Sequence, residues 1–364
     1  MKNNVILKPL FKYPGGKSSE YKYFKKFFPT FSNYVEPFLG GGAVFWATEA
    51  DRWIVNDYSS ELMSVYIYTQ EQDPIFLNYI KDIADIWELK VAIAGEIEQI
   101  LTTSLSNEEV TDFNIYNALY EGVDWLSDRQ GLLDNEILNS TKRKIKSLLR
   151  VSKNAEIKNL YENALGVIGS AIYTDLRSIY NITAFSKNPQ LKTALYLFLR
   201  EYSYSSMFRY NASGEFNVPF GGNSYSKKKF FDRYIQMTDL KVINKLAHTE
   251  LLVGDFADAL IDEEDTFIFL DPPYDSEFST YNLHIFDAAE QRRLHASLVG
   301  IKKSKWMMVI KSTPFIEELY GDKNLFLNKF DKNYSVNFKN RNDQKVEHLI
   351  ITNYKLENVK NGDN

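Results

Sequence analysis

The sequence contains no cysteine. Without a thiol the protein has no disulfide framework, no thiolate zinc site, no iron–sulfur cluster and no cysteine nucleophile. Histidine is almost as scarce, because the chain has only 4, dispersed as His248, His284, His295 and His348. Imidazole ligands are therefore not clustered along the chain, and we predict that the protein holds no catalytic metal ion.

Long apolar runs are also missing. None approaches the roughly 18 to 20 residues that cross a bilayer, and the N-terminal segment lacks the apolar core of a signal peptide. We therefore expect a cytoplasmic protein without a membrane anchor. The 364 residues are 44% hydrophobic and carry a formal net charge of −5, which is typical of one large globular domain or two smaller ones. This charge argues against a protein that coats nucleic acid, yet a local basic patch can still bind phosphate.

Three stretches of different character follow one another along the chain. Residues 1–70 alternate short apolar segments with glycine-rich turns, residues 71–245 space their apolar side chains at helical intervals, and residues 246–364 return to short apolar runs. Uninterrupted apolar runs are typical of strands buried on both faces of a parallel sheet. The pattern predicts an α/β protein with a Rossmann-like doubly wound sheet, built by the first and third stretches and interrupted by a mainly helical inserted domain.

A glycine loop follows the first apolar segment, in the sequence YVEPFLGGGAVFW. Glu36 is expected at the carboxyl end of a strand, and Gly40, Gly41 and Gly42 allow a turn without a Cβ before a helix begins. This arrangement suits a nucleoside or amino-acid group lying against the loop. These glycines do not match the dinucleotide-binding pattern GxGxxG. The separate segment GGKSS nearer the N-terminus is not a Walker A loop either, because Phe11 stands where that loop requires glycine. The alternative is a strand-to-helix turn that binds no ligand.

Asp57 ends the next predicted strand, WIVND. An acid at this place in a nucleotide-binding sheet accepts hydrogen bonds from both ribose hydroxyls. Its alternative role is to cap a helix that starts at Tyr58.

The segment TFIFLDPPY is the most informative in the chain. Apolar residues lead to Asp271 at the end of a strand, and two prolines without amide hydrogens then keep the backbone extended. The Asp271 carboxylate and the Pro272 carbonyl are two acceptors beside the ring of Tyr274. Together they suit a planar ring that bears an amino group. The alternative is a proline-rich turn capped by aspartate.

Several segments together resemble the Dam-like DNA adenine methyltransferases, in the motif order of that family. These segments are KYPGGK, EPFLGGG, ND, RYNASGEFNVPFGG, GDF, LDPPY and RNDQKVEHLIITNY. The resemblance spans nearly the whole chain, and the helical insertion is its least covered part. It implies that the sheet is that of an S-adenosylmethionine-dependent methyltransferase, that the target is the N6 amino group of adenine in double-stranded DNA, and that the base leaves the duplex before it reacts, as the base-flipping methyltransferases do.

The resemblance also implies the site residues. The acid matching Asp57 binds the ribose of S-adenosylmethionine, Asp255 and Phe256 match the pair that contacts its adenine, Asp271 matches the acid that faces the target amino group, and the ring matching Tyr274 stacks on the extruded base. The cofactor-binding positions implied in this way are Tyr13, Gly15, Gly16, Lys17, Glu36, Phe38, Gly40, Gly42, Asp57, Asp255 and Phe256, and the catalytic positions are Asp271, Pro272 and Tyr274.

DNA recognition is expected in the inserted domain. Basic and aromatic side chains are mixed there in a way that suits phosphate contacts and insertion into a groove. The candidate DNA-binding residues are Arg200, Arg209, Tyr210, Asn211, Lys227, Lys228 and Lys229. The alternative is a solvated loop with buried aromatics. Many relatives carry Asn-Gly where this chain has Ser205 and Ser206, so the recognition sequence is left open.

Three functional alternatives follow from these motifs. The absence of cysteine excludes carbon-5 methylation of cytosine, which needs a protein thiolate, and leaves amino-group methylation of DNA as the main hypothesis. An amino-group methyltransferase acting on RNA or protein is the second, and a catalytically inactive DNA-binding relative is the third. We expect a monomer that acts on double-stranded DNA, either alone or beside a cognate restriction endonuclease that it does not contact.

Overall fold

The computed structural model describes residues 7–13, 15–110, 113–115, 118–182, 187–273, 286–332 and 346–356. The chain divides into two compact units, described here one at a time. The first comprises Met1–Pro9, Gly15–Ile67 and Asn244–Asn364, and the second comprises Leu10–Pro14 and Tyr68–Ile243. Leu10–Pro14 thus groups with the helical unit, although the sequence pattern had placed it with the sheet.

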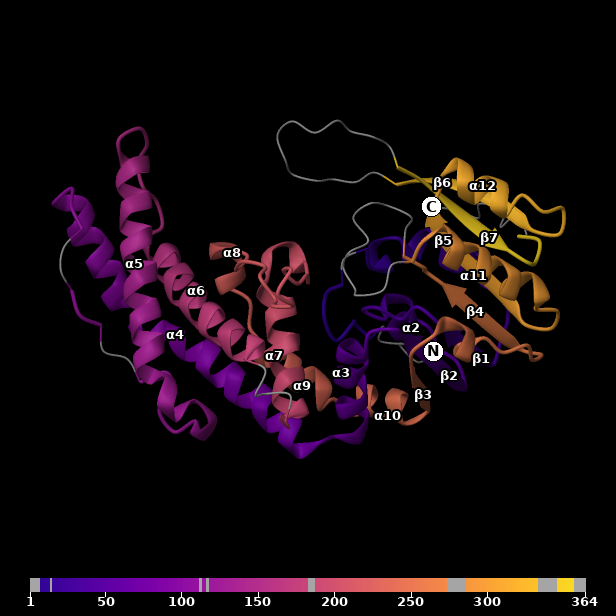
Figure 1. The fold of residues 1–364 in the computed structure, drawn as a ribbon, viewed down its shortest axis with the longest axis horizontal. Helices are drawn as coiled ribbons and strands as arrows, with labels where there is room; N and C mark the ends of the chain where they lie inside the picture. The colour runs from indigo at the N-terminus through magenta and orange to yellow at the C-terminus, as the bar shows by residue number, and fades with distance from the viewer. Residues whose placement is uncertain are drawn as a thin grey trace, which may run out of the picture. The chain divides into compact units, whose positions relative to one another are not determined.

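A seven-stranded sheet forms the centre of the first unit, in the order β3-β2-β1-β4-β5-β7-β6 (Figure 1). Its strands are β1 (Asn33–Glu36), β2 (Arg52–Asp57), β3 (Thr249–Val253), β4 (Thr266–Leu270), β5 (Lys305–Lys311), β6 (Phe326–Lys332) and β7 (Val346–Thr352). β1 to β5 are mutually parallel, and β7 runs antiparallel to both β5 and β6. This topology confirms the predicted Rossmann-like α/β fold.

Short helices accompany this sheet. They are η1 (Lys17–Ser19), α1 (Tyr21–Phe24), η2 (Lys25–Phe27), α2 (Ala43–Ala47), η6 (Phe256–Ala259), α11 (Ala288–Gly300) and α12 (Pro314–Leu319), while α3 (Ser60–Glu71) and α10 (Leu240–Ala247) lead to and from the second unit.

Strand β4 shows how both faces of the sheet are buried. Ile268 and Leu270 belong to the core shared with α11 and α12. Phe267 and Phe269 alternate with them, and the ring of Phe269 stacks on that of Phe24 with 5.3 Å between the centroids. Because successive side chains of a strand point to opposite faces, the apolar run TFIFL requires cover on both sides. That cover explains why the sequence shows no polar alternation here.

The strand order around β1 places the candidate residues together at the carboxyl ends of the strands. β1 lies between β2 and β4, so the chain winds away from β1 in opposite directions before and after the helical insertion. In open parallel sheets ligands bind at the carboxyl ends of the strands, where the strand order reverses. Glu36, Asp57 and Asp271 stand at the carboxyl ends of β1, β2 and β4.

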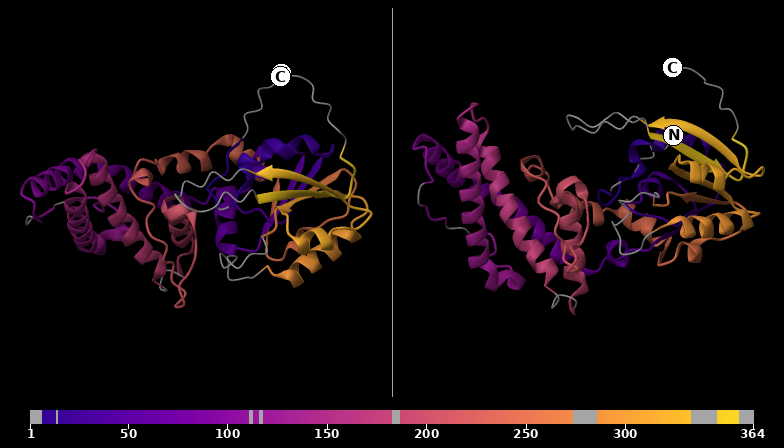
Figure 2. Two further views of the ribbon diagram at one scale, coloured as in Figure 1. Left: turned by 90° about the horizontal axis from the view of Figure 1, so that it is seen from above. Right: turned by 45° about the horizontal axis from the view of Figure 1, so that its top comes forward.

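The second unit is helical. Its helices are α4 (Pro74–Ser106), η3 (Asp124–Arg129), α5 (Gln130–Ser152), α6 (Leu160–Asn181), α7 (Pro189–Tyr202), η5 (Tyr204–Ser206), α8 (Asn223–Ser226) and α9 (Phe231–Met237). α6 packs against both α4 and α5, and these long helices are seen from two further directions in Figure 2.

Helix α4 forms for reasons visible in its sequence. Asp73 caps it by accepting hydrogen bonds from the backbone N–H groups of Ile75 and Phe76, and Pro74 occupies the first turn, where no N–H is needed. Buried side chains such as Ile80 and Trp87 repeat along one face at helical spacing. Within the described ranges no helix combines the length and apolarity of a membrane span.

Candidate functional site

An ion pair links the first motif to the end of β4. The Lys17 ammonium lies 2.6 Å from Oδ1 of Asp271, and the side chains are 2% and 21% exposed. The same ammonium donates a 3.3 Å hydrogen bond to the Gly15 carbonyl, where the positive φ of +79° favours glycine. The structure therefore brings together two predicted residues that lie 254 positions apart in the sequence.

The glycine loop is fixed by Asp57. Its Oδ2 accepts a 2.8 Å hydrogen bond from the backbone N–H of Gly40, and its Oδ1 accepts one of 2.9 Å from that of Ser59. The carboxylate therefore joins the end of β2 to the loop after β1. The following helix, α3, begins at Ser60 and not at Tyr58, and its cap is Ser59, whose hydroxyl accepts a 3.3 Å hydrogen bond from the backbone N–H of Leu62, so the capping alternative for Asp57 is wrong.

Gly42 is required by a close approach. It adopts a φ of +66°, and a Cβ at this position would lie 2.8 Å from the Tyr66 hydroxyl. That hydroxyl donates a 3.3 Å hydrogen bond to the carbonyl of Gly40. A larger residue at position 42 would displace the tyrosine that holds the loop.

Asn56 connects two loops at the same edge of the sheet. Its side-chain amide donates hydrogen bonds of 3.0 Å to the Pro37 carbonyl and 3.1 Å to the Gly254 carbonyl. The residue is 1% exposed, and within the described part of the chain its Oδ1 has no hydrogen-bond partner. The loops that carry Phe38 and Asp255 are thereby held to a common residue on β2.

Glu36 is buried at the end of β1. Its Oε2 accepts a 2.7 Å hydrogen bond from the Tyr34 hydroxyl. Burial raises the pKa of Glu36 to about 8, the Tyr34 hydrogen bond opposes this rise, and the nearby charge of Asp271 adds to it. Glu36 is therefore largely protonated at neutral pH, and this predicted residue enters the site as a neutral group.

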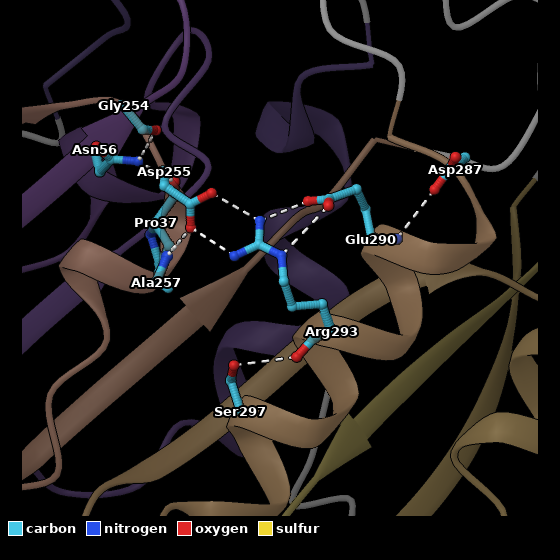
Figure 3. A network of polar contacts seen from close by, with 9 residues as sticks. All are labelled: Pro37, Asn56, Gly254, Asp255, Ala257, Asp287, Glu290, Arg293 and Ser297. Carbon is cyan, nitrogen blue, oxygen red and sulfur yellow. Dashed lines mark hydrogen bonds and ion pairs between the residues drawn. The ribbon is translucent and has the colours of Figure 1, made fainter.

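Asp255 and Phe256 follow β3, and the Asp255 carboxylate meets Arg293 of α11 (Figure 3). Arg293 forms two parallel hydrogen bonds to the Asp255 carboxylate, of 2.8 and 2.7 Å, and its guanidinium lies 4.2 Å from the centroid of the Phe256 ring. The ring also packs against Phe38, with 5.4 Å between the centroids. Three predicted cofactor residues thus form one cluster with an arginine that was not predicted.

The predicted catalytic segment is described as far as residue 273. Pro272 is buried, and the carbonyl of Pro273 accepts a 3.4 Å hydrogen bond from the side chain of Gln291 on α11. Tyr274, to which the resemblance assigned the stacking role, lies outside the described residues.

Several DNA-binding candidates sit on or beside a tight turn of the helical unit. Tyr210 pairs with Phe216 in an antiparallel bridge, and between them Asn211 accepts hydrogen bonds from the backbone N–H groups of Ser213 and Glu215. The Tyr210 hydroxyl lies 2.8 Å from that of Tyr180 on α6. Asn211 therefore shapes the turn, and the adjacent Arg209 is exposed.

Arg200 has a different environment from the one expected of a phosphate contact. Its side chain is buried, its Nε donates a 2.8 Å hydrogen bond to the Tyr196 hydroxyl, and its guanidinium lies 4.5 Å from the centroid of the Tyr13 ring. The neighbouring Glu201 accepts a hydrogen bond from the backbone N–H of Lys12. These contacts tie Tyr13 to the helical unit, and we leave Arg200 out of the proposed DNA surface.

The three consecutive lysines also differ from one another. Lys227 is exposed and pairs with Glu162 at 2.5 Å, and Lys229 is exposed. Lys228 is half-buried and donates to the Glu201 carbonyl, and burial lowers the pKa of its ammonium to about 8. Lys227 and Lys229 thus lie at the surface of the helical unit, whereas Lys228 is held in its local packing.

Sequence reasoning missed Tyr34, Asn56, Gln291 and Arg293. Asn56 precedes Asp57 in the ND motif and could have been singled out from it. The other three carry no motif signal, because their contacts depend on which side of a strand or helix faces the site. In the described residues no group of three or more histidine, aspartate or glutamate side chains could hold a metal ion.

The chain is similar to known DNA methyltransferases. The family model of the D12 class N6 adenine-specific DNA methyltransferases matches residues 13–95 and 167–336. A type II methyltransferase of Lactococcus lactis subsp. cremoris is 22% identical over 363 residues, which cover 97% of this chain and 98% of that protein. The DNA adenine methylase of Escherichia coli is 24% identical over 357 residues, 96% and 95% of the two chains.

A third relative matches a shorter stretch. A type II methyltransferase of a Paramecium bursaria Chlorella virus is 28% identical over 227 residues, which cover 61% of this chain and 82% of that protein. The family model covers both segments that build the sheet edge as well as much of the helical unit. The chain therefore belongs to the D12 class of N6 adenine-specific DNA methyltransferases.

Proposed function

We propose that the chain transfers the methyl group of S-adenosylmethionine to the N6 amino group of an adenine extruded from double-stranded DNA, with Asp271 as the acceptor that orients this amino group. The ion pair between Asp271 and Lys17 carries the proposal, because it fixes the acid of the LDPPY motif beside the KYPGGK segment, which the resemblance assigns to the cofactor site.

The residues at the sheet edge fit S-adenosylmethionine. Asp57 would hold the ribose, the loop at Gly40 and Gly42 would lie against the cofactor, and Asp255 with Phe256 would contact the adenine. The buried Oδ1 of Asn56, which has no hydrogen-bond partner in the described residues, is a further acceptor at the same edge. When bound, S-adenosylmethionine supplies a methyl group on a positively charged sulfonium.

The residues around Asp271 act on the target amino group. The lone pair of an adenine amino group is conjugated into the ring and is a poor nucleophile. Two acceptors, the Asp271 carboxylate and the Pro272 carbonyl, would hold its hydrogens and favour a tetrahedral nitrogen whose lone pair is available. The contribution of the protein is positioning and electrostatic stabilisation, without a covalent intermediate on the enzyme.

The helical unit is proposed to hold the DNA. The turn around Asn211 presents Arg209, and the exposed Lys227 and Lys229 add positive charge on the same unit. Phosphate contacts of this kind position a duplex without reading its sequence.

Two variants, one expected to impair methyl transfer and the other cofactor binding, test the proposed roles of Asp271 and Asp57. Asp271→Ala is expected to abolish transfer of labelled methyl from S-adenosylmethionine to DNA while S-adenosylhomocysteine still binds, as measured by calorimetry. Asp57→Ala is expected to weaken that binding. Full turnover by Asp271→Ala, or transfer to RNA or protein in preference to DNA, would contradict the proposal. Modification-sensitive sequencing of the methylated DNA would identify both the base and its sequence context.

A further inference from the structure

Arg293 lies between two carboxylates, as Figure 3 shows, and it also contacts one aromatic ring. On one side its Nη1 and Nη2 donate to the two oxygens of Asp255, at 2.8 and 2.7 Å. On the other its Nε and Nη2 donate to Glu290, at 3.3 and 2.5 Å. The Cζ atom of the guanidinium lies 4.2 Å from the centroid of the Phe256 ring.

We propose that Arg293 is a positioning residue for the cofactor site, which fixes the Asp255 carboxylate and the Phe256 ring in the orientation that receives the adenine of S-adenosylmethionine. This inference rests on the proposed function, in which Asp255 and Phe256 contact that adenine.

The Asp255 carboxylate needs such a partner. Asp255 follows Gly254, whose backbone φ of +138° is rarely adopted by residues that have a side chain. The Asp255 side chain is 39% exposed. A carboxylate on a short stem in contact with water can rotate between several orientations. The guanidinium fork binds both oxygens in one plane, and the backbone N–H of Ala257 donates to Oδ1 at 2.8 Å. Together they select one orientation of the acid.

The same arginine reaches Phe256. That ring is 4% exposed and packs against Phe38 and Phe286, with centroid separations of 5.4 and 6.0 Å. Because one guanidinium contacts both Asp255 and Phe256, the acceptor and the aromatic surface are held in a fixed relation to each other. A purine that donates from its amino group and stacks on a ring requires such a relation.

Arg293 is itself held in place. Asp287 caps α11 by accepting from the backbone N–H groups of Ala289 and Glu290, and Glu290 then meets Arg293 one turn later. The hydrogen bonds that Arg293 donates to Asp255 and Glu290 raise its pKa further above its usual value. Two carboxylates around one guanidinium leave a net negative charge of one, which suits an amino-group donor and a cationic cofactor.

The cluster is poorly suited to a purely structural role. Arg293 and Asp255 are each 39% exposed, and exposed ion pairs contribute at most about 1 kcal/mol to folding. Arg293→Ala is therefore expected to fold, so that its effect on cofactor binding can be measured directly.

The experiment measures S-adenosylhomocysteine binding by calorimetry. Arg293→Ala is expected to weaken it on the order of tenfold, and Arg293→Lys, which keeps the charge but lacks the fork, is expected to recover only a small part of the loss. In steady-state assays the KM for S-adenosylmethionine should rise while kcat at saturation stays the same. The control is Arg292→Ala, since this adjacent arginine is exposed and lies over the Phe315 ring at 5.0 Å.

A modified ligand separates positioning from general stability. The 6-oxo analogue of S-adenosylhomocysteine offers an acceptor where the adenine has its amino donor, so wild type should bind it more weakly than the parent. Arg293→Ala should lose most of this preference. An unchanged affinity and preference in Arg293→Ala would overturn the inference.

Asp255→Ala separates the inferred role of Arg293 from the proposed contact between Asp255 and the adenine. If it weakens binding while Arg293→Ala does not, the inference is wrong and the proposed adenine contact stands. If neither variant weakens binding, the assignment of Asp255 to the adenine is wrong and the inference is lost with it.

Discussion

The ammonium of Lys17 lies 2.6 Å from a carboxylate oxygen of Asp271, although 254 residues separate the two in the chain. Lys17 is almost fully buried, so its charge requires a partner in the fold. The pairing joins the KYPGGK segment to the LDPPY segment. A cation at this distance also stabilises the negative charge of Asp271, which the proposed mechanism uses as an acceptor.

This pairing predicts a large effect of Lys17→Met on catalysis. Loss of the ammonium leaves Asp271 without its fixed partner, and we expect methyl transfer to fall on the order of a hundredfold, as when one preorganised charge is removed from an active site. The measurement is single-turnover transfer of labelled methyl to DNA. Lys22→Met is the control, because this lysine is exposed on α1.

The double variant Lys17→Met/Asp271→Asn makes the test specific. Residues that act as one unit have strongly non-additive effects. We expect the double variant to lose little more activity than Asp271→Asn alone. Additive losses would show that the two side chains act independently, contrary to the interpretation of the ion pair.

The separate environments of the three lysines predict different effects on DNA binding. Lys227→Ala/Lys229→Ala should weaken binding and reduce the slope of log K against log salt by about 2, since each lost phosphate contact accounts for about 0.9. Lys228→Ala should change the slope less, because its ammonium is half-buried with a pKa lowered to about 8. Fluorescence anisotropy at several salt concentrations measures both slopes.

A second pair of exposed lysines supplies the control. Lys302 and Lys303 follow α11 in the sheet unit, and their backbone N–H groups donate to Asp262. Lys302→Ala/Lys303→Ala removes the same charge without disturbing those bonds and should leave the salt slope as it is. An equal loss of slope in both double variants would mean that total charge, not a local surface, determines binding.

The apolar strands could be predicted because each belongs to a sheet with both faces covered. TFIFL and WMMVI need no alternation when aromatic side chains cover one face and helices the other. β6 was missed for the opposite reason. It is an edge strand that pairs with β7 alone, and its sequence FLNKFDK mixes apolar and charged residues. Only the pairing with β7 identifies it as a strand.

The site could be predicted as a set of residue types but not as a set of contacts. Motifs identified Asp57 and Asp271, because an acid after a run of strand residues has a recognisable pattern. Arg293 has no such pattern, since its role depends on the side of α11 that faces Asp255. Arg200 shows the reverse error, because a charged residue in α7 looks exposed until the burial of that helix is known.

The turn at Ser205 predicts a stabilising substitution. Ser205 and Ser206 have φ values of +54° and +53°, where a Cβ is disfavoured. Replacing the exposed Ser205 by glycine should relieve about 1 kcal/mol of strain against about 0.5 kcal/mol of added chain entropy. We expect a net gain of about 0.5 kcal/mol in the free energy of unfolding, measured with urea. Ser64→Gly, inside helix α3, should lower it instead, and a loss in Ser205→Gly would contradict the argument.

The buried Glu36 predicts a dependence of stability on pH. Burial raises its pKa from the usual 4.5 to about 8, so the folded protein keeps the proton in a range where the unfolded chain has lost it. The unfolded state then binds fewer protons, and this group lowers the free energy of unfolding by up to about 1.4 kcal/mol for each pH unit between these two values. The stabilising contribution is complete below pH 4.5 and is lost as the pH rises to about 8.

Glu36→Gln removes this dependence. The amide oxygen can still accept from the Tyr34 hydroxyl, but it carries no proton to lose. The stability of the variant relative to wild type should therefore increase steadily from pH 5 to pH 8 and then level off. Urea unfolding of the cofactor-free protein at each pH measures the difference. Glu263→Gln changes an exposed position, and its free energy of unfolding should instead follow that of wild type across the same pH range. If Glu36→Gln also followed wild type, Glu36 would be ionised in the folded protein, and the site would contain a buried negative charge in place of a neutral acid.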